Sequence, residues 1–300
     1  VETQLLQGGI FAMSKPVIVL NELTKSYGKH RGIENISFTV EQGEVFGFIG
    51  PNGAGKSTTI RTLMGLLKPS NGGASIFGLD CSREPARIAK DVGYLPSENC
   101  YYNNMKVKEM LFYTAELYGV NAHSRMEELA ERLNLDLSRR IGDLSLGNKK
   151  KVGIVSALLP SPKLLIMDEP TSGLDPVSRD ELLQVLSEYI EDGEHSVLFS
   201  THITGDLERI ADYITYISYG ELFFSGGKDE FVDMFRIVKG GTNELSADLK
   251  EKAVGIRTFP TGFEALLKIE DTSAFSALSI EPATIDEIVV FTSKKGDEYE

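Results

Sequence analysis

The chain has 300 residues, of which 41% are hydrophobic and 25% are charged, as in a globular α/β protein with one large domain and room for a small appendage. Its formal net charge is −13, from 31 basic and 44 acidic side chains, so it is poorly suited to bind a nucleic-acid backbone. Cys81 and Cys100 form no CxxC pair. This argues against a disulfide scaffold or a structural zinc site and favours a reducing cytosol.

No window of the sequence approaches 18 uninterrupted apolar residues, so we expect no membrane-spanning helix. The first methionine is Met13, and the stretch before it is short and lacks the basic start of a signal peptide. We therefore interpret residues 1–12 as an added leader.

Strands and helices are expected to alternate over most of the chain. The expected strands lie in residues 17–40 (two strands around a polar turn), 44–50, 74–77, 92–95, 164–167 and 196–200, followed by a hairpin that turns at Tyr219–Gly220. A helix is expected over residues 56–67, ending before Pro69. This alternation predicts an α/β fold with a mostly parallel sheet covered on both faces.

Residues from about 99 to 160 have a helical character instead, which predicts an inserted α-helical lobe. Apolar side chains recur there at helical spacing, and we expect them to pack in the core. They are Met110, Leu111, Tyr113, Leu117, Tyr118, Met126, Leu129 and Leu133. After about Gly227 the pattern restarts as a weaker mix of short helices and strands with 9 basic and 15 acidic residues, which predicts a small α+β extension over residues 227–300.

The stretch from Gly50 to Ser57 matches G-x-x-x-x-G-K-[ST] in full and lies between an apolar strand and a helix. Glycines let the backbone N–H groups curl around an anion, and the helix start adds its positive dipole end. We expect Lys56 to reach the β- and γ-phosphates and the Ser57 hydroxyl to ligate Mg²⁺. The expected nucleotide contacts are Gly50, Pro51, Asn52, Gly53, Ala54, Gly55, Lys56, Ser57 and Thr58.

Asp168 and Glu169 directly follow the apolar strand at residues 164–167. Ligands of open α/β sheets bind at the carboxyl ends of the strands, where these two carboxylates would lie. We predict that Asp168 holds Mg²⁺ through water and that Glu169 orients and deprotonates the attacking water. An isolated Asp-Glu pair is more often solvated surface, but here it accompanies a phosphate loop.

With these motifs, the sequence resembles the ATP-binding subunits of ABC transporters from about residue 17 to residue 226. Residues 144–148 (LSLGN) look like the signature motif, and the run from Pro170 to Asp175 is similar to the D-loop. His202 stands at the place of the switch histidine and Tyr27 at that of the aromatic that stacks on adenine. On position alone, His202 is also consistent with a capped strand end and Tyr27 with a structural turn residue.

The resemblance implies an ATPase domain over residues 13–226, with its helical lobe at about residues 99–160. It also implies a head-to-tail homodimer, or a dimer with a similar subunit, that sandwiches each ATP. In that dimer, Ser145 and Gly147 of one copy and Asp175 near the interface would complete the site of the other. Lys56, Glu169 and His202 would be the catalytic groups. The implied cofactors are ATP and Mg²⁺, and the implied partner is a separate permease at the cytoplasmic face of the cell membrane.

Several positions depart from the family's pattern. Leu146 replaces a glycine, Asn148 a glutamine, and Lys151 an arginine. The family's Q-loop glutamine should follow YLP, where this sequence has Ser97 and then Glu98. Ser97 is too short for the usual role, and Glu98 is a candidate substitute. With these departures, the sequence resembles the family branch that contains drug and antimicrobial-peptide exporters.

The alternative function is that of a non-transport ABC ATPase in DNA repair or translation. The acidic charge and the absence of long coiled coils or of a second nucleotide domain in the sequence disfavour it. We also predict that Tyr101 and Tyr102 line a groove for the permease, the other interpretation being a core role. The extension could stabilise the dimer, dock on the permease or regulate turnover. The resemblance implies that the membrane subunit mainly selects the transported substrate.

Overall fold

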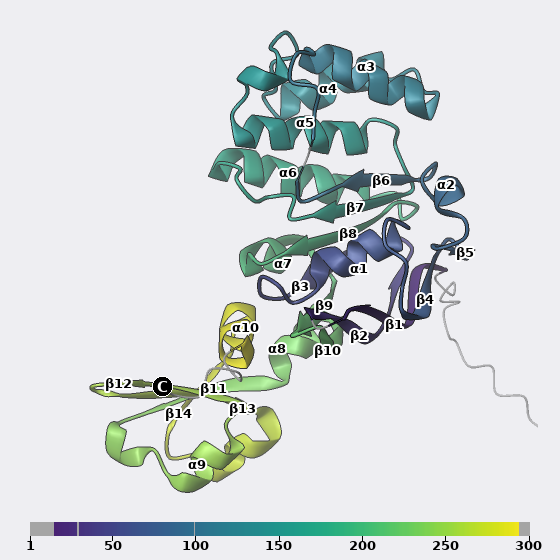
Figure 1. Ribbon diagram of the computed structural model, residues 1–300. Coiled ribbons are helices and arrows are strands. Elements are labelled where there is room, and N and C mark those ends of the chain that lie inside the picture. The colour runs from purple at the N-terminus through teal and green to yellow at the C-terminus, as the bar shows by residue number, and fades with distance from the viewer. Residues whose placement is uncertain (1–14, 29, 99, 294–300) are drawn as a thin grey trace, which may run out of the picture.

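The computed structural model describes residues 15–28, 30–98 and 100–293 (Figure 1). The interpretation of residues 1–12 as a leader lies outside the described residues. A larger part of the molecule contains the parallel sheet, and a smaller C-terminal part lies beside it (Figure 1). In the part of the chain that the structure describes, none of the helices has the length and apolar content needed to cross a bilayer.

A mainly parallel sheet forms the centre of the larger part, in the order β10-β9-β3-β8-β7-β6. All neighbouring strands are parallel except β10, which pairs with β9 as the predicted hairpin. The strands are β3 (Val45–Ile49), β6 (Val92–Leu95), β7 (Leu164–Asp168), β8 (Ser196–Thr201), β9 (Tyr213–Ser218) and β10 (Glu221–Gly227). They agree with the α/β class that the sequence predicts.

The two faces of this sheet belong to different apolar cores, because successive side chains of a strand point to opposite sides. Phe46 and Phe48 of β3 pack on the side of α1, whereas Val45 and Ile49 pack on the side of α5, α6 and α7. The helices are α1 (Lys56–Leu63), α2 (Pro85–Ile88), α5 (Leu146–Leu158), α6 (Pro176–Tyr189) and α7 (Thr204–Ile210).

Helix α1 is shorter than the predicted helix over residues 56–67. It ends at Leu63, and Gly65 then adopts a left-handed φ of +68°. A Cβ at Gly65 would lie 2.7 Å from the carbonyl oxygen of Cys81, so this turn requires glycine. The helix is therefore ended by Gly65 and not by Pro69.

An antiparallel sheet packs over α1, with the strand order β2-β1-β4-β5. Its strands are β1 (Pro16–Tyr27), β2 (His30–Glu41), β4 (Asn71–Ile76) and β5 (Leu79–Asp80). Strands β1 and β2 are longer than expected and form a hairpin with several register shifts. Buried Ile18, Leu23 and Ile36 connect this sheet to the α1 side of the central sheet.

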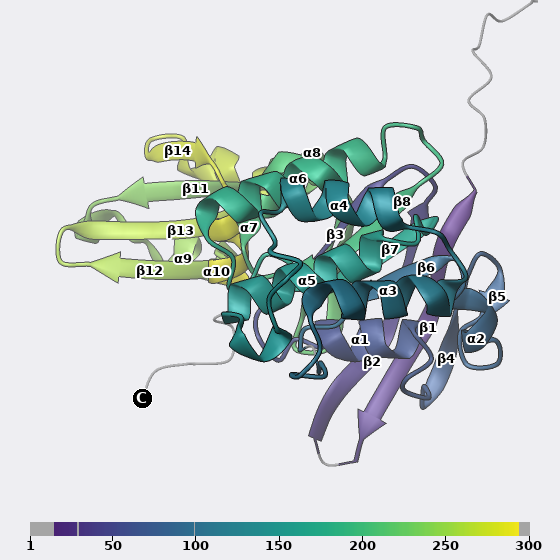
Figure 2. The ribbon, with the colours of Figure 1, turned by 90° about the horizontal axis from the view of Figure 1, so that it is seen from above.

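The helical lobe consists of α3 (Val107–Tyr118), α4 (His123–Arg132), the short helix η1 (Ile141–Asp143) and the start of α5, stacked beyond the β6 edge of the sheet (Figures 1 and 2). Leu111 and Met126 are buried, as the helical spacing predicts. The core prediction is wrong for Tyr113 and Leu117, which are 43% and 68% exposed. Among the described residues, no other element covers the outer face of α3, so these two side chains stay exposed.

The C-terminal part is an antiparallel sheet in the order β12-β13-β11-β14 with helices on both faces. Its elements are α8 (Lys228–Asp233), β11 (Phe235–Gly240), η2 (Thr242–Glu244), α9 (Ala247–Lys252), β12 (Gly255–Phe259), β13 (Gly262–Lys268), η3 (Ile269–Phe275), β14 (Ser279–Pro282) and α10 (Ile285–Ser293). Helix α10 lies between this sheet and α7 (Figures 1 and 2).

Candidate active site

The phosphate loop connects β3 to α1, as the sequence predicts. A Cβ at Gly50 would lie 2.3 Å from the carbonyl oxygen of Ile217, and one at Gly55 would lie 2.4 Å from Cγ2 of Ile33. Gly55 also has a φ of +108°, which disfavours any side chain. The loop therefore curls tightly against β2 and β9 and brings its backbone to the start of α1.

Lys56 is 6% exposed, and its ammonium is held within the loop. It donates to the carbonyl oxygens of Gly50, at 2.6 Å, and Pro51, at 3.4 Å. Its Nζ also lies 3.3 Å from Oε1 of Glu169. A buried ammonium with these partners is fixed in position at the mouth of the phosphate loop.

A cavity of about 310 Å³ lies over this loop. It is lined by Gly32, Pro51, Asn52, Gly53, Gly55, Lys56, Ser57, Thr58, Ser97 and Glu169. Seven of the nine predicted nucleotide-contact residues line it, the exceptions being Gly50 and Ala54. Loop N–H groups, the start of α1 and one cation around a cavity are the features that bind phosphate.

Asp168 and Glu169 end β7 at the carboxyl edge of the sheet, beside β8. Ser200 of β8 lies opposite Asp168 in the sheet and forms hydrogen bonds with both Asp168 and Glu169. Its hydroxyl donates to Oδ1 of Asp168 at 2.5 Å and accepts from the backbone N–H of Glu169 at 3.0 Å. Glu169 has a left-handed φ of +52°, which is unusual for a non-glycine residue and turns its side chain toward the phosphate loop.

His202 follows β8 and contacts the same carboxylate. Its Nδ1 lies 2.7 Å from Oε2 of Glu169, so Nδ1 is the donor, because a carboxylate only accepts. Glu169 therefore bridges Lys56 and His202, one on each carboxylate oxygen. The three predicted catalytic residues form one connected group.

The second oxygen of Asp168 provides a test for a cation. Asp168 is fully buried, and its Oδ2 has no hydrogen-bond partner among the described residues. A buried carboxylate oxygen without a partner is costly unless a ligand satisfies it. No group of three or more His, Cys, Asp and Glu side chains that could hold a metal exists in the described ranges. Because the Oδ2 of Asp168 lacks a partner and Ser57 lines the phosphate cavity, these two residues fit Mg²⁺, which commonly takes one protein carboxylate and completes its shell with phosphate oxygens and water.

The signature segment begins α5. Ser145 is the N-cap, and its hydroxyl accepts from the backbone N–H of Asn148 at 3.3 Å. A Cβ at Gly147 would lie 2.8 Å from the carbonyl oxygen of Gly173, so the helix start packs closely on the D-loop segment. Leu146, which replaces a glycine, is 83% exposed and is accommodated at the surface.

Asp175 has a structural role in the isolated chain. It is the N-cap of α6 and accepts from the N–H groups of Val177 and Ser178 at 3.1 and 3.0 Å. Hydrogen bonds from the Ser178 hydroxyl and N–H hold the pKa of Asp175 below its ordinary value. A role across a dimer interface stays a prediction for this residue.

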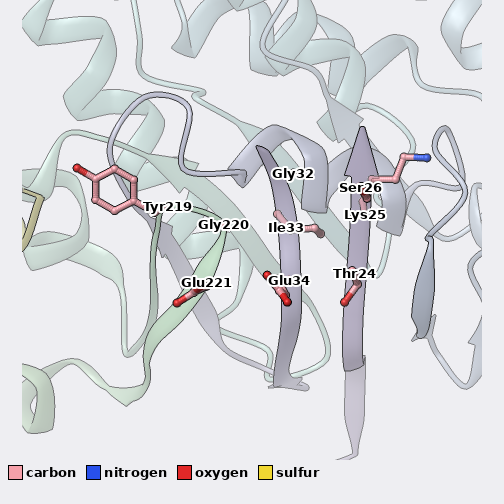
Figure 3. A pocket seen from close by; sticks show the side chains of 9 residues that line it. All are labelled: Thr24, Lys25, Ser26, Gly32, Ile33, Glu34, Tyr219, Gly220 and Glu221. Carbon is pink, nitrogen blue, oxygen red and sulfur yellow. The ribbon is translucent and has the colours of Figure 1, made fainter. Parts of the chain in front are cut away.

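Tyr27 ends β1 and is 43% exposed. The ammonium of Lys25 lies 5.5 Å from the centre of its ring. A separate cavity of about 440 Å³ lies between the β1–β2 hairpin and the β9–β10 turn (Figure 3). Gly32 lines both this cavity and the phosphate cavity. Tyr27 does not line this cavity, so adenine stacking on Tyr27 also stays a prediction. The sequence reasoning missed the contribution of Tyr219 and Gly220 from the hairpin turn.

Ser97 follows β6 and lies at the phosphate cavity, which places the departure from the Q-loop pattern inside the site. Glu98 is exposed and lines the adjoining cavity with Glu169 and His202. The sequence reasoning missed Lys150 of α5, which is 8% exposed and donates to the carbonyl oxygen of Ser97 at 3.2 Å. A lysine on the buried side of an apolar helix was the signal that could have found it.

Tyr101 and Tyr102 differ from each other. Both line a shallow cavity of about 540 Å³ together with residues 103–105. Tyr102 is 66% exposed, whereas Tyr101 packs against the core and its hydroxyl is buried. Burial raises the pKa of Tyr101. The ring of Tyr102 is therefore exposed at this cavity, whereas Tyr101 packs mainly in the core, and a permease contact of either residue stays a prediction.

These features define a phosphate-loop ATPase. The ABC transporter family model matches residues 33–172. The bacitracin transport ATP-binding protein BcrA of Bacillus licheniformis is 35% identical, over 69% of this chain and 68% of its own. The uncharacterized ABC transporter ATP-binding protein YhcH of Bacillus subtilis is 30% identical over 95% of both chains. A solved structure of an ATP binding subunit of an ABC transporter has a TM-score of 0.66 and 33% identity, covering 71% of this chain and 91% of its own.

The chain belongs to the ATP-binding subunits of ABC transporters, and its activity is ATP hydrolysis.

Proposed function

We propose that this chain hydrolyses Mg²⁺-bound ATP as one half of a dimer and drives export of a substrate through a separate membrane subunit. The observation that carries the proposal is the position of Glu169, whose carboxylate lines the phosphate cavity with Lys56 and Ser57. The name of BcrA, a bacitracin transport protein, supports a role in transport. The net charge of −13 gives no support to a nucleic-acid partner.

The chain's own residues have distinct tasks in this proposal. Lys56 leaves Glu169 for the β- and γ-phosphates, which are stronger partners than one carboxylate. Glu169 then accepts a proton from the attacking water, while His202 keeps the carboxylate oriented through its Nδ1–H. Ser57 and Asp168 would hold Mg²⁺, which would supply charge neutralisation at the phosphates. Catalysis is thus mainly positioning and charge compensation.

The second copy would complete the site with the start of its α5. The N-cap Ser145 and the N–H groups near Gly147 form a helix start that favours an anion. The exposure of Leu146 at this helix start leaves the surface accessible to a partner. Asp175 would lie at the same interface, and Tyr27 would contact adenine.

The membrane subunit would contact the helical lobe. Tyr102, Tyr113 and Leu117 are exposed there, and large exposed apolar side chains often mark interaction sites. This contact would place the protein peripherally at the cytoplasmic face of the cell membrane.

The Glu169→Gln variant tests both the base and the dimer. We expect it to bind ATP with Mg²⁺, to elute as a dimer in size-exclusion chromatography with light scattering, and to hydrolyse ATP at least ~100-fold more slowly, because the amide cannot accept the proton. Glu270→Gln, a control at an exposed carboxylate in η3, should behave like the unmodified protein. Hydrolysis at the native rate would contradict the base assignment, and a monomer with bound ATP would contradict the dimer.

A further inference from the structure

Lys150 is a buried cation that the mechanism above does not use. It lies on α5, five positions after the N-cap Ser145, and is 8% exposed. Within the described residues, its one hydrogen bond is the 3.2 Å contact to the carbonyl oxygen of Ser97. No carboxylate lies within 4.0 Å of its ammonium in the described part of the chain, and a buried ammonium without an ion pair is costly.

The surroundings of Lys150 lead directly to the hydrolytic residues. A cavity of about 560 Å³ is shared by Ser97, Lys150, Glu169 and His202, next to the phosphate cavity that Ser97 and Glu169 also line. Burial lowers the pKa of Lys150, and the negative charges of Asp168 and Glu169 oppose this shift. The carboxylates that counteract the effect of burial on this lysine are therefore the two that serve ATP hydrolysis.

The position of Lys150 also connects two parts of the fold. The segment at Ser97 leaves β6 and leads into the helical lobe, whereas Glu169 leaves the neighbouring strand β7. Lys150 reaches Ser97 from a helix that packs against β6. An ammonium has three donors, and one carbonyl accepts only one of them. The remaining donors can serve the negative charge that gathers at the site.

We propose that Lys150 is a positioning residue for ATP hydrolysis: its ammonium holds the segment after β6 against the Asp168–Glu169 pair and so fixes the helical lobe relative to the attacking water. The departure at Ser97 fits this role. The side chain there is too short to cross the cavity, and the bridge is supplied from α5 instead. Small displacements of such a scaffold reduce turnover more than substrate binding.

Variants at position 150 separate this role from a purely structural one. We expect Lys150→Met to lower kcat for ATP about 10-fold to 100-fold while the KM for ATP changes less than about 2-fold. Lys150→Arg, which keeps the charge and the donors, should retain kcat within about 3-fold. Lys163→Met is the matched control. Lys163 precedes β7 and pairs at 3.3 Å with Asp91, which precedes β6, so this lysine joins the two strands at their amino ends, away from the site. It should leave kcat unchanged.

A second-site variant keeps the proposal falsifiable if methionine disrupts folding. Ser97 lines both cavities, so a glutamine there can extend into the space that Lys150 bridges. We expect Ser97→Gln to restore at least part of the kcat lost in Lys150→Gln, which a general loss of stability would not allow. Native kcat in Lys150→Met would overturn the proposal. The proposal would also be overturned if Lys150→Arg lost as much kcat as Lys150→Gln and if adding Ser97→Gln to Lys150→Gln restored none of the loss.

Discussion

The ATPase part and the C-terminal part of this chain both pack helices on a sheet, but their polar and apolar side chains are distributed differently. In the ATPase part, polar side chains converge at one edge of the sheet, where Lys56, Asp168, Glu169 and His202 lie within a few contacts of one another. In the C-terminal part, the sheet is covered on both faces by apolar side chains, such as Val238 on one face and Ile237 on the other.

The apolar core does not stop where the sequence motifs stop. Phe235 and Ile237 of β11 and Phe291 of α10 belong to the same continuous cluster as Met167 and Phe199 of the central sheet. We therefore expect the extension to unfold together with the ATPase part rather than as a separate unit. The chemistry lies in one part, while the stability is shared between them.

The largest expected effect comes from breaking this shared core. Phe291 is 3% exposed on α10, and its ring packs beneath the guanidinium of Arg257. Phe291→Ala should lower the free energy of unfolding by about 3 to 5 kcal/mol, because it leaves a cavity and removes a large apolar side chain from the core. Chemical denaturation followed by circular dichroism measures this loss.

Phe259→Ala is the control for that variant. Phe259 lies on the edge strand β12 and is 41% exposed, so its truncation should cost less than about 1 kcal/mol. Two separate unfolding transitions in the Phe291→Ala protein, with the ATPase transition unmoved, would contradict the shared core.

A pair of serine caps sharpens the comparison between the two parts. Ser145 caps α5 in the ATPase part, and Ser246 caps α9 in the C-terminal part with an accepted bond of 3.1 Å from Leu249. Alanine at either position should cost about 1 kcal/mol of stability. Only Ser145→Ala should also slow ATP hydrolysis, by about 10-fold, since only Ser145 is proposed to face a phosphate in the partner copy.

Steady-state ATPase assays and thermal unfolding of both alanine variants distinguish a serine that only caps its helix from one that also supports ATP hydrolysis. Equal ATPase rates in Ser145→Ala and Ser246→Ala would show that the signature serine is merely a helix cap here. A slower rate in Ser246→Ala would instead connect the C-terminal part to turnover.

The smallest expected effect concerns one hydrogen bond between the two parts. The hydroxyls of Tyr216 on β9 and Thr292 on α10 lie 2.7 Å apart and are both buried. Tyr216→Phe should lower stability by about 1 kcal/mol. Tyr213→Phe removes a hydroxyl from a 41% exposed ring on the same strand and should be neutral. Equal melting temperatures for the two variants would contradict a contribution from this bond.

Much of the site could be predicted because phosphate chemistry requires specific residues in a specific order. The curl around Gly55, the cation Lys56 and the carboxylates that end β7 are each encoded within a few consecutive residues. The parallel sheet follows from short apolar strands that alternate with helices. These local patterns are sufficient to predict that Asp168 and Glu169 lie at the carboxyl edge of the sheet, without knowledge of how the strands pair.

Contacts between distant segments could not be predicted in the same way. The bridge from Ser200 to Asp168 depends on the register between β7 and β8, and the contact from Lys150 to Ser97 depends on how α5 packs on β6. A sequence pattern gives neither. Tyr113 and Leu117 show the same limit, since helical spacing defines a face of α3 but not how much of it is covered.

The placement of α10 restricts how the C-terminal part can move. The chain enters that part through α8, directly after β10, and its last described helix returns to pack against α7 and to bond Tyr216. A body joined at one point can swivel freely, whereas one joined at two points keeps a single axis of rotation at most. A reorientation of the C-terminal sheet about any other axis would therefore displace β9 or α7, which are elements of the ATP-binding part.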